Sequence, residues 1–102
     1  MRKRNDGEHT YSTQNNIERS IKYFREYYSL SSKIENIEGL VDAPKGLGNC
    51  YMEIGDYAEA IKNYEKAVQR ASVKNAGPQE TAKKVEALCQ IIKSHILKGD
   101  EG

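Results

Sequence analysis

Apolar residues recur every three or four positions along four stretches of the chain. The first stretch carries Ile17, Ile21, Phe24 and Tyr28. A period near 3.6 puts such residues on one face of a helix. The spacing therefore predicts an amphipathic helix over residues 17–33 with Asn16 as its N-cap. Residues 1–14 are polar and aperiodic, which predicts a disordered or loop head.

A second helical pattern follows Asn36, a residue type that favours helix N-caps, and continues to Ile54. Pro44 lies inside this pattern. Because proline has no N–H to donate to the carbonyl of Leu40, the helix either kinks there or begins afresh at Asp42.

Turn residues separate the later helices. Gly55 can adopt a left-handed conformation, Asp56 can cap a helix over residues 57–73, and Glu59 has the spacing of a capping-box partner. Gly77-Pro78 predicts the start of a last helix that ends at Gly99-Asp100. The sequence thus predicts an all-α chain of about four helices and no strands, whose short loops favour antiparallel neighbours.

The chain also repeats itself. Residues 15–24 match residues 55–64 at an offset of 40, and the region after Val41 matches the region after Val85 at an offset of 44. Such periods indicate a solenoid of helix hairpins. We expect a repeat segment over 15–100, which divides into half repeat 15–35, full repeat 36–74 and half repeat 78–100.

Small and large residues alternate in the full repeat. The small ones are Gly48, Ala60 and Ala67; the large ones are Leu47, Tyr51, Tyr57 and Tyr64. With the Gly55-Asp56 turn, this pattern resembles the tetratricopeptide repeat (TPR) family. Two positions depart from it, since Pro44 stands where an aromatic is usual and Ser72 replaces a terminal proline. The 40-residue spacing is similar to the longer-repeat subgroup, which includes cell-polarity adaptors and axonemal or ciliary proteins.

The resemblance implies where a partner would bind. In that family the first helix of each pair lines the concave side of a superhelix and commonly holds peptide segments. The corresponding positions here are Asp42, Lys45, Asn49, Met52, Glu86, Cys89, Lys93 and Ile96. Lys45 and Lys93 would meet a partner carboxylate, and Asn49 a peptide backbone. Lys45 and Asn49 also match two positions of the carboxylate clamp, with which some relatives bind the C-terminal carboxylates of heat-shock chaperones. The other residues of that clamp are absent here. The alternative to a binding site is that this helix face is only exposed to solvent and binds no partner.

Two functions follow as hypotheses. The first is an adaptor or scaffold module that binds a partner peptide or helix on the concave face. The second is an architectural or self-associating repeat in a larger assembly, such as a ciliary or axonemal complex. Tyr23, Tyr27 and Tyr28 either pack on the second helix or form an exposed aromatic interface.

Composition and short motifs limit the other functions that this chain could have. A net charge of +1 gives no reason to expect nucleic-acid binding. Because the chain has no long apolar run and no signal sequence, we expect no membrane span and a cytoplasmic location, with a cytoskeletal or ciliary location as the narrower option. Cys50 and Cys89 match no metal spacing, so we expect free buried thiols and no metal or cofactor.

Adjacent Ser94 and His95 diverge by about 100° on a helix, so they cannot act together as a nucleophile and its base, and we expect no enzyme. We also expect the chain to be an excerpt of a longer array.

Overall fold

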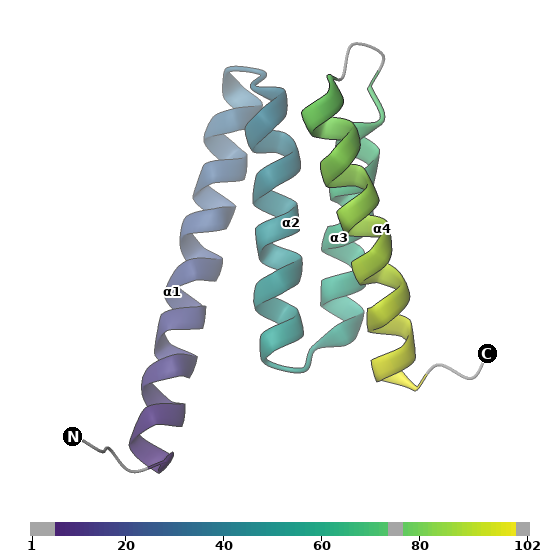
Figure 1. The fold of residues 1–102 in the computed structure, drawn as a ribbon. Coiled ribbons are helices and arrows are strands. Elements are labelled where there is room, and N and C mark those ends of the chain that lie inside the picture. Colours follow the sequence, from purple (N-terminus) through teal and green to yellow (C-terminus); the bar gives the residue numbers. More distant parts are fainter. Residues whose placement is uncertain (1–5, 74–76, 100–102) are drawn as a thin grey trace.

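Four helices form the chain in the computed structural model, which describes the backbone of residues 6–73 and 77–99 and the side chains of 15–73 and 77–99. They are α1 (Asp6–Lys33), α2 (Ile37–Glu53), α3 (Tyr57–Ala71) and α4 (Pro78–Lys98). Each packs antiparallel on the next, and α2 also touches α4. Figure 1 shows α1 at one edge of the array and α4 at the other. No strand occurs in the described ranges, so the predicted all-α hairpin solenoid is confirmed.

The first helix is longer than its apolar pattern predicts. It begins at Asp6 rather than near Ile17, so Asn16 lies inside the helix and caps nothing. The loop expected over residues 6–14 is therefore replaced by helix, and residues 1–5 of that predicted head lie outside the described residues. No proline interrupts residues 6–16, and each residue added to an existing helix gains a backbone hydrogen bond.

The second helix passes through Pro44 without a break. It begins after Asn36, whose side chain accepts a hydrogen bond from the Gly39 N–H at 3.3 Å, as predicted for an N-cap. A fresh start at Asp42 is therefore wrong. The Pro44 ring is fully buried. Its apolar packing offsets the hydrogen bond that proline cannot donate to Leu40.

The turn between α2 and α3 has the predicted left-handed glycine, since Gly55 has φ +82°. Asp56 caps α3 by accepting a hydrogen bond from the Glu59 N–H at 3.3 Å. The reciprocal half of the predicted capping box is missing. The Asp56 N–H donates instead to the Tyr51 carbonyl at 2.9 Å, and the Glu59 carboxylate pairs with Lys62 at 3.2 Å.

The last two helices end close to where the sequence places their boundaries. Helix α3 stops at Ala71, two residues before its predicted end at 73, and the Ser72 hydroxyl donates to the Val68 carbonyl at 2.8 Å. Helix α4 starts at Pro78 as expected. Its end is marked by Gly99, which has a left-handed φ of +73°.

The core lies where small residues let helices approach. Its centre is a cluster of buried residues from α3 and α4: Ala60, Tyr64, Ala67 and Ala87. Gly48 of α2 receives the ring of Tyr64, and Gly46 receives the ring of Phe24 from α1. Among the repeat positions, Leu47 is also buried, Tyr51 and Tyr57 are half-buried, and Gly55 is exposed in its turn. The spacing of small and large residues thus serves helix packing.

Candidate partner-binding site

Helix α2 turns the predicted groove residues toward α4, where most of them find partners within the chain. Lys45 forms an ion pair with Glu86, and Asp42 forms one with Lys83 at 2.8 Å. The Lys83 side chain is mostly shielded, and its hydrogen bond to Asp42 raises the pKa of its ammonium group. These charged positions therefore hold α2 to α4 in the unbound chain.

Two further groove residues connect with the interior. The Asn49 side-chain oxygen accepts a hydrogen bond from the Tyr64 hydroxyl. Burial raises the pKa of that phenol to about 12, with a smaller contribution from Cys50. The Met52 sulfur lies 2.9 Å from the Ser94 hydroxyl, which is buried and also donates to the Gln90 carbonyl at 2.7 Å. Asn49 is nevertheless exposed, and within the described residues its amide nitrogen has no hydrogen-bond partner.

A pocket of about 240 Å³ remains between α2 and α4, and we call it the α2–α4 groove. Its lining residues are Lys45, Asn49, Val85, Glu86, Cys89 and Gln90. The groove thus brings together four of the predicted positions: Lys45, Asn49, Glu86 and Cys89. Asp42 and Met52 do not line it, and Lys93 and Ile96 lie farther along α4 as exposed side chains.

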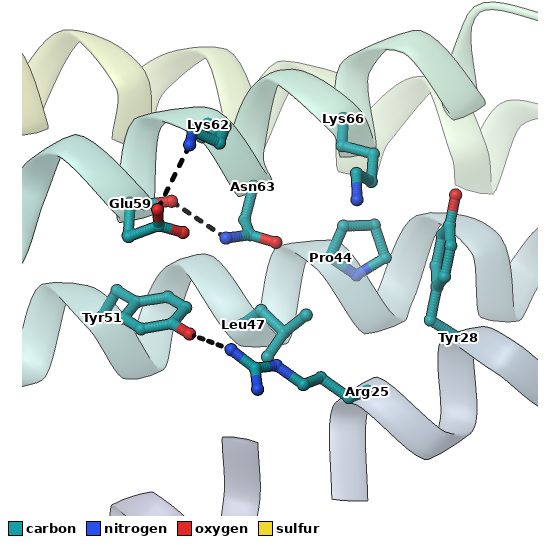
Figure 2. Close-up of a pocket in the computed structure, with 9 residues that line it drawn as sticks. All are labelled: Arg25, Tyr28, Pro44, Leu47, Tyr51, Glu59, Lys62, Asn63 and Lys66. Atoms are coloured by element: carbon teal, nitrogen blue, oxygen red, sulfur yellow. Dashed lines mark hydrogen bonds and ion pairs between the residues drawn. The ribbon is translucent and has the colours of Figure 1, made fainter. Parts of the chain in front are cut away.

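A second pocket of about 240 Å³ lies between α1, α2 and α3, and we call it the α1–α3 pocket. Figure 2 shows its lining: Arg25, Tyr28, Pro44, Leu47, Tyr51, Glu59, Lys62, Asn63 and Lys66. Sequence reasoning missed this site, because its cations come from two helices that are about 40 residues apart. The 40-residue offset makes α1 and α3 equivalent helices of successive repeats, which would place them on the same side of the solenoid. It could not have shown that their cationic side chains meet in one pocket.

Aromatic hydroxyls hold two arginines at this pocket. The Arg25 guanidinium donates to the Tyr51 hydroxyl at 2.7 Å. Arg70, which lies just beyond the lining, donates to the Tyr28 hydroxyl at 2.7 and 3.1 Å. Tyr28 therefore lies against α3. Tyr27 is 38% exposed, with its ring beside Gly39 of α2, and Tyr23 is 63% exposed. Of the two alternatives that the sequence left open, packing on the second helix holds for Tyr27, and the exposed aromatic interface stays a prediction.

The two cysteines are both free, but they differ in environment. Cys50 is buried, and burial raises the pKa of its thiol, with Glu53 adding to the shift. Cys89 is exposed on the α2–α4 groove, so the expectation that both thiols are buried is wrong for Cys89. Among the side chains of residues 15–73 and 77–99, no three acidic, histidine or cysteine residues cluster in a way that could hold a metal ion.

Comparison with known families gives a match in two places. Two family models, both described as "Tetratricopeptide repeat", match residues 45–72 and residues 9–34. Together they cover just over half of the chain. The chain belongs to the tetratricopeptide repeat family. Comparison with curated proteins and with solved structures gave no match.

The two matches fall on different parts of the TPR fold. Residues 45–72 span the hairpin of α2 and α3, and residues 9–34 span α1. TPR repeats are generally protein–protein interaction modules, which gives this chain its broad functional class. The longer-repeat subgroup stays a prediction. No helix within the described residues is long and apolar enough to cross a membrane.

Proposed function

We propose that this chain is an interaction module that binds an extended peptide segment of a partner in the α2–α4 groove. The observation that carries the proposal is the groove itself, which lies between the two helices that the repeat pattern assigns as first helices. Family membership supports the class of function. The geometry supports the α2–α4 groove as the binding site, because exposed polar groups and an apolar side chain, Val85, line it together.

The groove offers a peptide complementary groups. The Asn49 amide nitrogen can donate to a peptide carbonyl, while its oxygen keeps the bond from Tyr64. The Lys45–Glu86 pair presents both charges at the rim, and the Glu86 side chain is 60% exposed. A partner carboxylate would compete with Glu86 for Lys45. Because Glu86 can turn to solvent while the partly shielded Lys45 keeps a carboxylate partner, the exchange should cost little; ion pairs near the surface contribute about 0–1 kcal/mol.

Charge reversal with a matched swap tests this proposal. Affinity capture from cell extract with the full chain should lose its partners when Lys45→Glu is introduced. The double variant Lys45→Glu/Glu86→Lys keeps an internal ion pair but inverts the charges offered to a partner, so it should fold and still fail to bind. Lys22→Glu on α1, an exposed position that lines neither pocket, should bind as wild type. Unchanged capture by the swapped variant would refute the proposal.

A second candidate function, self-association, has its own observation. Residues of α4 are exposed although their counterparts 44 positions earlier are buried by neighbouring helices. Val85 is 55% exposed and Leu88 is 43% exposed, whereas Val41 and Pro44 are fully buried. On α1, Tyr27 is 38% exposed, while its counterpart Ala67 is buried. We propose as the alternative that α1 of one copy covers α4 of another.

The contact between copies would not duplicate the α2–α3 hairpin. Ile92 of α4 corresponds, at the offset of 44, to Gly48 of α2, whose lack of a side chain makes room for the Tyr64 ring. Because Ile92 has a large side chain, a helix that packs on α4 must lie farther from it than α3 lies from α2. Sedimentation velocity across about 10 µM to 1 mM protein should show association that Ile92→Lys/Ile96→Lys abolishes. A monomer at every concentration would exclude this alternative and leave the peptide-binding proposal unaffected. The cytoplasmic or ciliary location stays a prediction.

A further inference from the structure

The α1–α3 pocket collects more positive than negative charge. Arg25, Lys62 and Lys66 line it, and Arg70 lies beside it, whereas Glu59 is the one carboxylate in its lining. Glu59 pairs with Lys62 at 3.2 Å. Within the described residues no ion pair forms at Arg25, Lys66 or Arg70, so three cations are left without a carboxylate.

Tyrosines position these cations without neutralising them. The Arg25 guanidinium is held by the Tyr51 hydroxyl, and Arg70 by the Tyr28 hydroxyl. The Lys66 ammonium lies 5.1 Å from the centroid of the Tyr28 ring, a cation–π distance. Ordering a cation before a ligand arrives lowers the entropy cost of binding that ligand. The positive charge therefore remains available to an anion.

The walls between the cations are apolar. Figure 2 shows Lys66 on α3 and Arg25 on α1 on either side of Pro44 and Leu47, both of which are buried. Low-dielectric walls strengthen the attraction between a cation and an anion placed against them. Glu59 stands at the Tyr51 end and is paired with Lys62, so an anion is favoured between Arg25 and Lys66, over Pro44 and Leu47.

The size of the pocket limits what it can hold. At about 240 Å³ it is smaller than the roughly 300–1,000 Å³ typical of small-molecule sites. It suits one side chain and not a cofactor. We propose that this pocket binds a single oxyanionic side chain, a carboxylate or a phosphate, on an acidic peptide segment of a partner protein. Guanidinium groups recognise both oxyanions through paired hydrogen bonds.

This site is separate from the α2–α4 groove. Helix α2 contributes Pro44, Leu47 and Tyr51 to the pocket and Lys45 and Asn49 to the groove. At about 100° per residue these two sets point to opposite sides of α2. A partner segment in the pocket would consequently leave the groove open.

Titration of the full chain with fluorescent peptides tests the inference. The probes are nine-residue Gly/Ser peptides that carry three glutamates, one phosphoserine or three lysines. The two acidic probes should bind with a Kd that weakens as salt rises, and the lysine probe should not bind. Whichever acidic probe binds more tightly identifies carboxylate or phosphate as the preferred oxyanion.

Variants assign the binding to this pocket. Arg25→Gln/Lys66→Gln should weaken acidic-probe binding at least tenfold, with circular dichroism confirming an unchanged helix content. Lys22→Gln/Lys84→Gln removes the same charge from exposed or partly exposed positions outside the pocket and should change the Kd less than twofold. Lys45→Glu should leave this binding intact, which separates it from the groove. Equal loss in both double variants, or no acidic binding at 1 mM peptide, would overturn the inference.

Discussion

The backbone of Gly48 lies against the ring of Tyr64. A Cβ atom added to Gly48 would stand 2.5 Å from the Tyr64 Cε1 atom, well inside van der Waals contact. Tyr64 is fully buried and comes from the next helix. The α2–α3 hairpin therefore depends on one position having no side chain, so that a large ring can fill the space beside it.

Gly48→Ala should destabilise the fold in spite of alanine's better helix propensity. Overpacking costs about 1–3 kcal/mol, and the propensity gain returns at most about 1 kcal/mol. We expect a net loss of about 1–2 kcal/mol in urea unfolding. In a Tyr64→Ala background the clash is gone, so the same substitution should become neutral or stabilising. A loss of equal size in both backgrounds would show that the ring contact is not the cause.

Alkaline pH should weaken the fold through Tyr64. Its pKa is about 12 in the folded chain against an ordinary 10, so the folded state holds this proton more tightly. The resulting stability is complete below pH 10 and is lost as the pH rises to 12. At pH 11 the loss should be about 1 kcal/mol. Urea unfolding of wild type and Tyr64→Phe should therefore converge between pH 9 and 11, and a constant difference between them would contradict the assignment.

Gly55 should resist replacement for a conformational reason alone. Its φ is +82°, and a Cβ there would meet no atom within 4 Å. Gly55→Ala should cost about 1–2 kcal/mol, the penalty of a left-handed conformation for an L-residue. Gly55→Asn should cost clearly less, because asparagine tolerates this region. Thermal unfolding of both variants measures the difference, and equal losses would point to a steric cause instead.

The Asp42–Lys83 ion pair should stabilise the contact between α2 and α4 modestly. Its atoms lie 2.8 Å apart, and both side chains are partly shielded. A double-mutant cycle to Asn and Gln should give a coupling of about 0.5–1 kcal/mol that falls in 1 M salt. The more exposed Glu59–Lys62 pair within α3 serves as the comparison and should give about 0.2–0.5 kcal/mol. The reverse order would contradict the role of shielding.

Much of the fold could be predicted because its determinants are local. Asn36 and Asp56 cap helices, Gly55 turns the chain, and Pro78 opens α4, and each acts within a few residues. The largest exception is the start of α1. Polar composition favoured a loop there, but a polar segment without proline can still continue a helix that is already formed.

The candidate site was less predictable because it depends on pairs far apart in sequence. Helical spacing placed Lys45 and Asn49 on one face of α2, yet it could not show that Glu86 and Tyr64 already engage them. The α1–α3 pocket is a stronger case, since Arg25 and Lys66 meet only after α1 and α3 are folded onto α2. Which side chains meet across two helices depends on how the helices pack. The spacing of residues within one helix does not reveal that packing.

Helix α2 forms part of both candidate sites, on opposite sides of the same cylinder. Two segments bound there would be separated by the thickness of one helix, roughly 10 Å. Such an arrangement makes the repeat a coupler: it could hold two polypeptides at a fixed, short separation without either one touching the other.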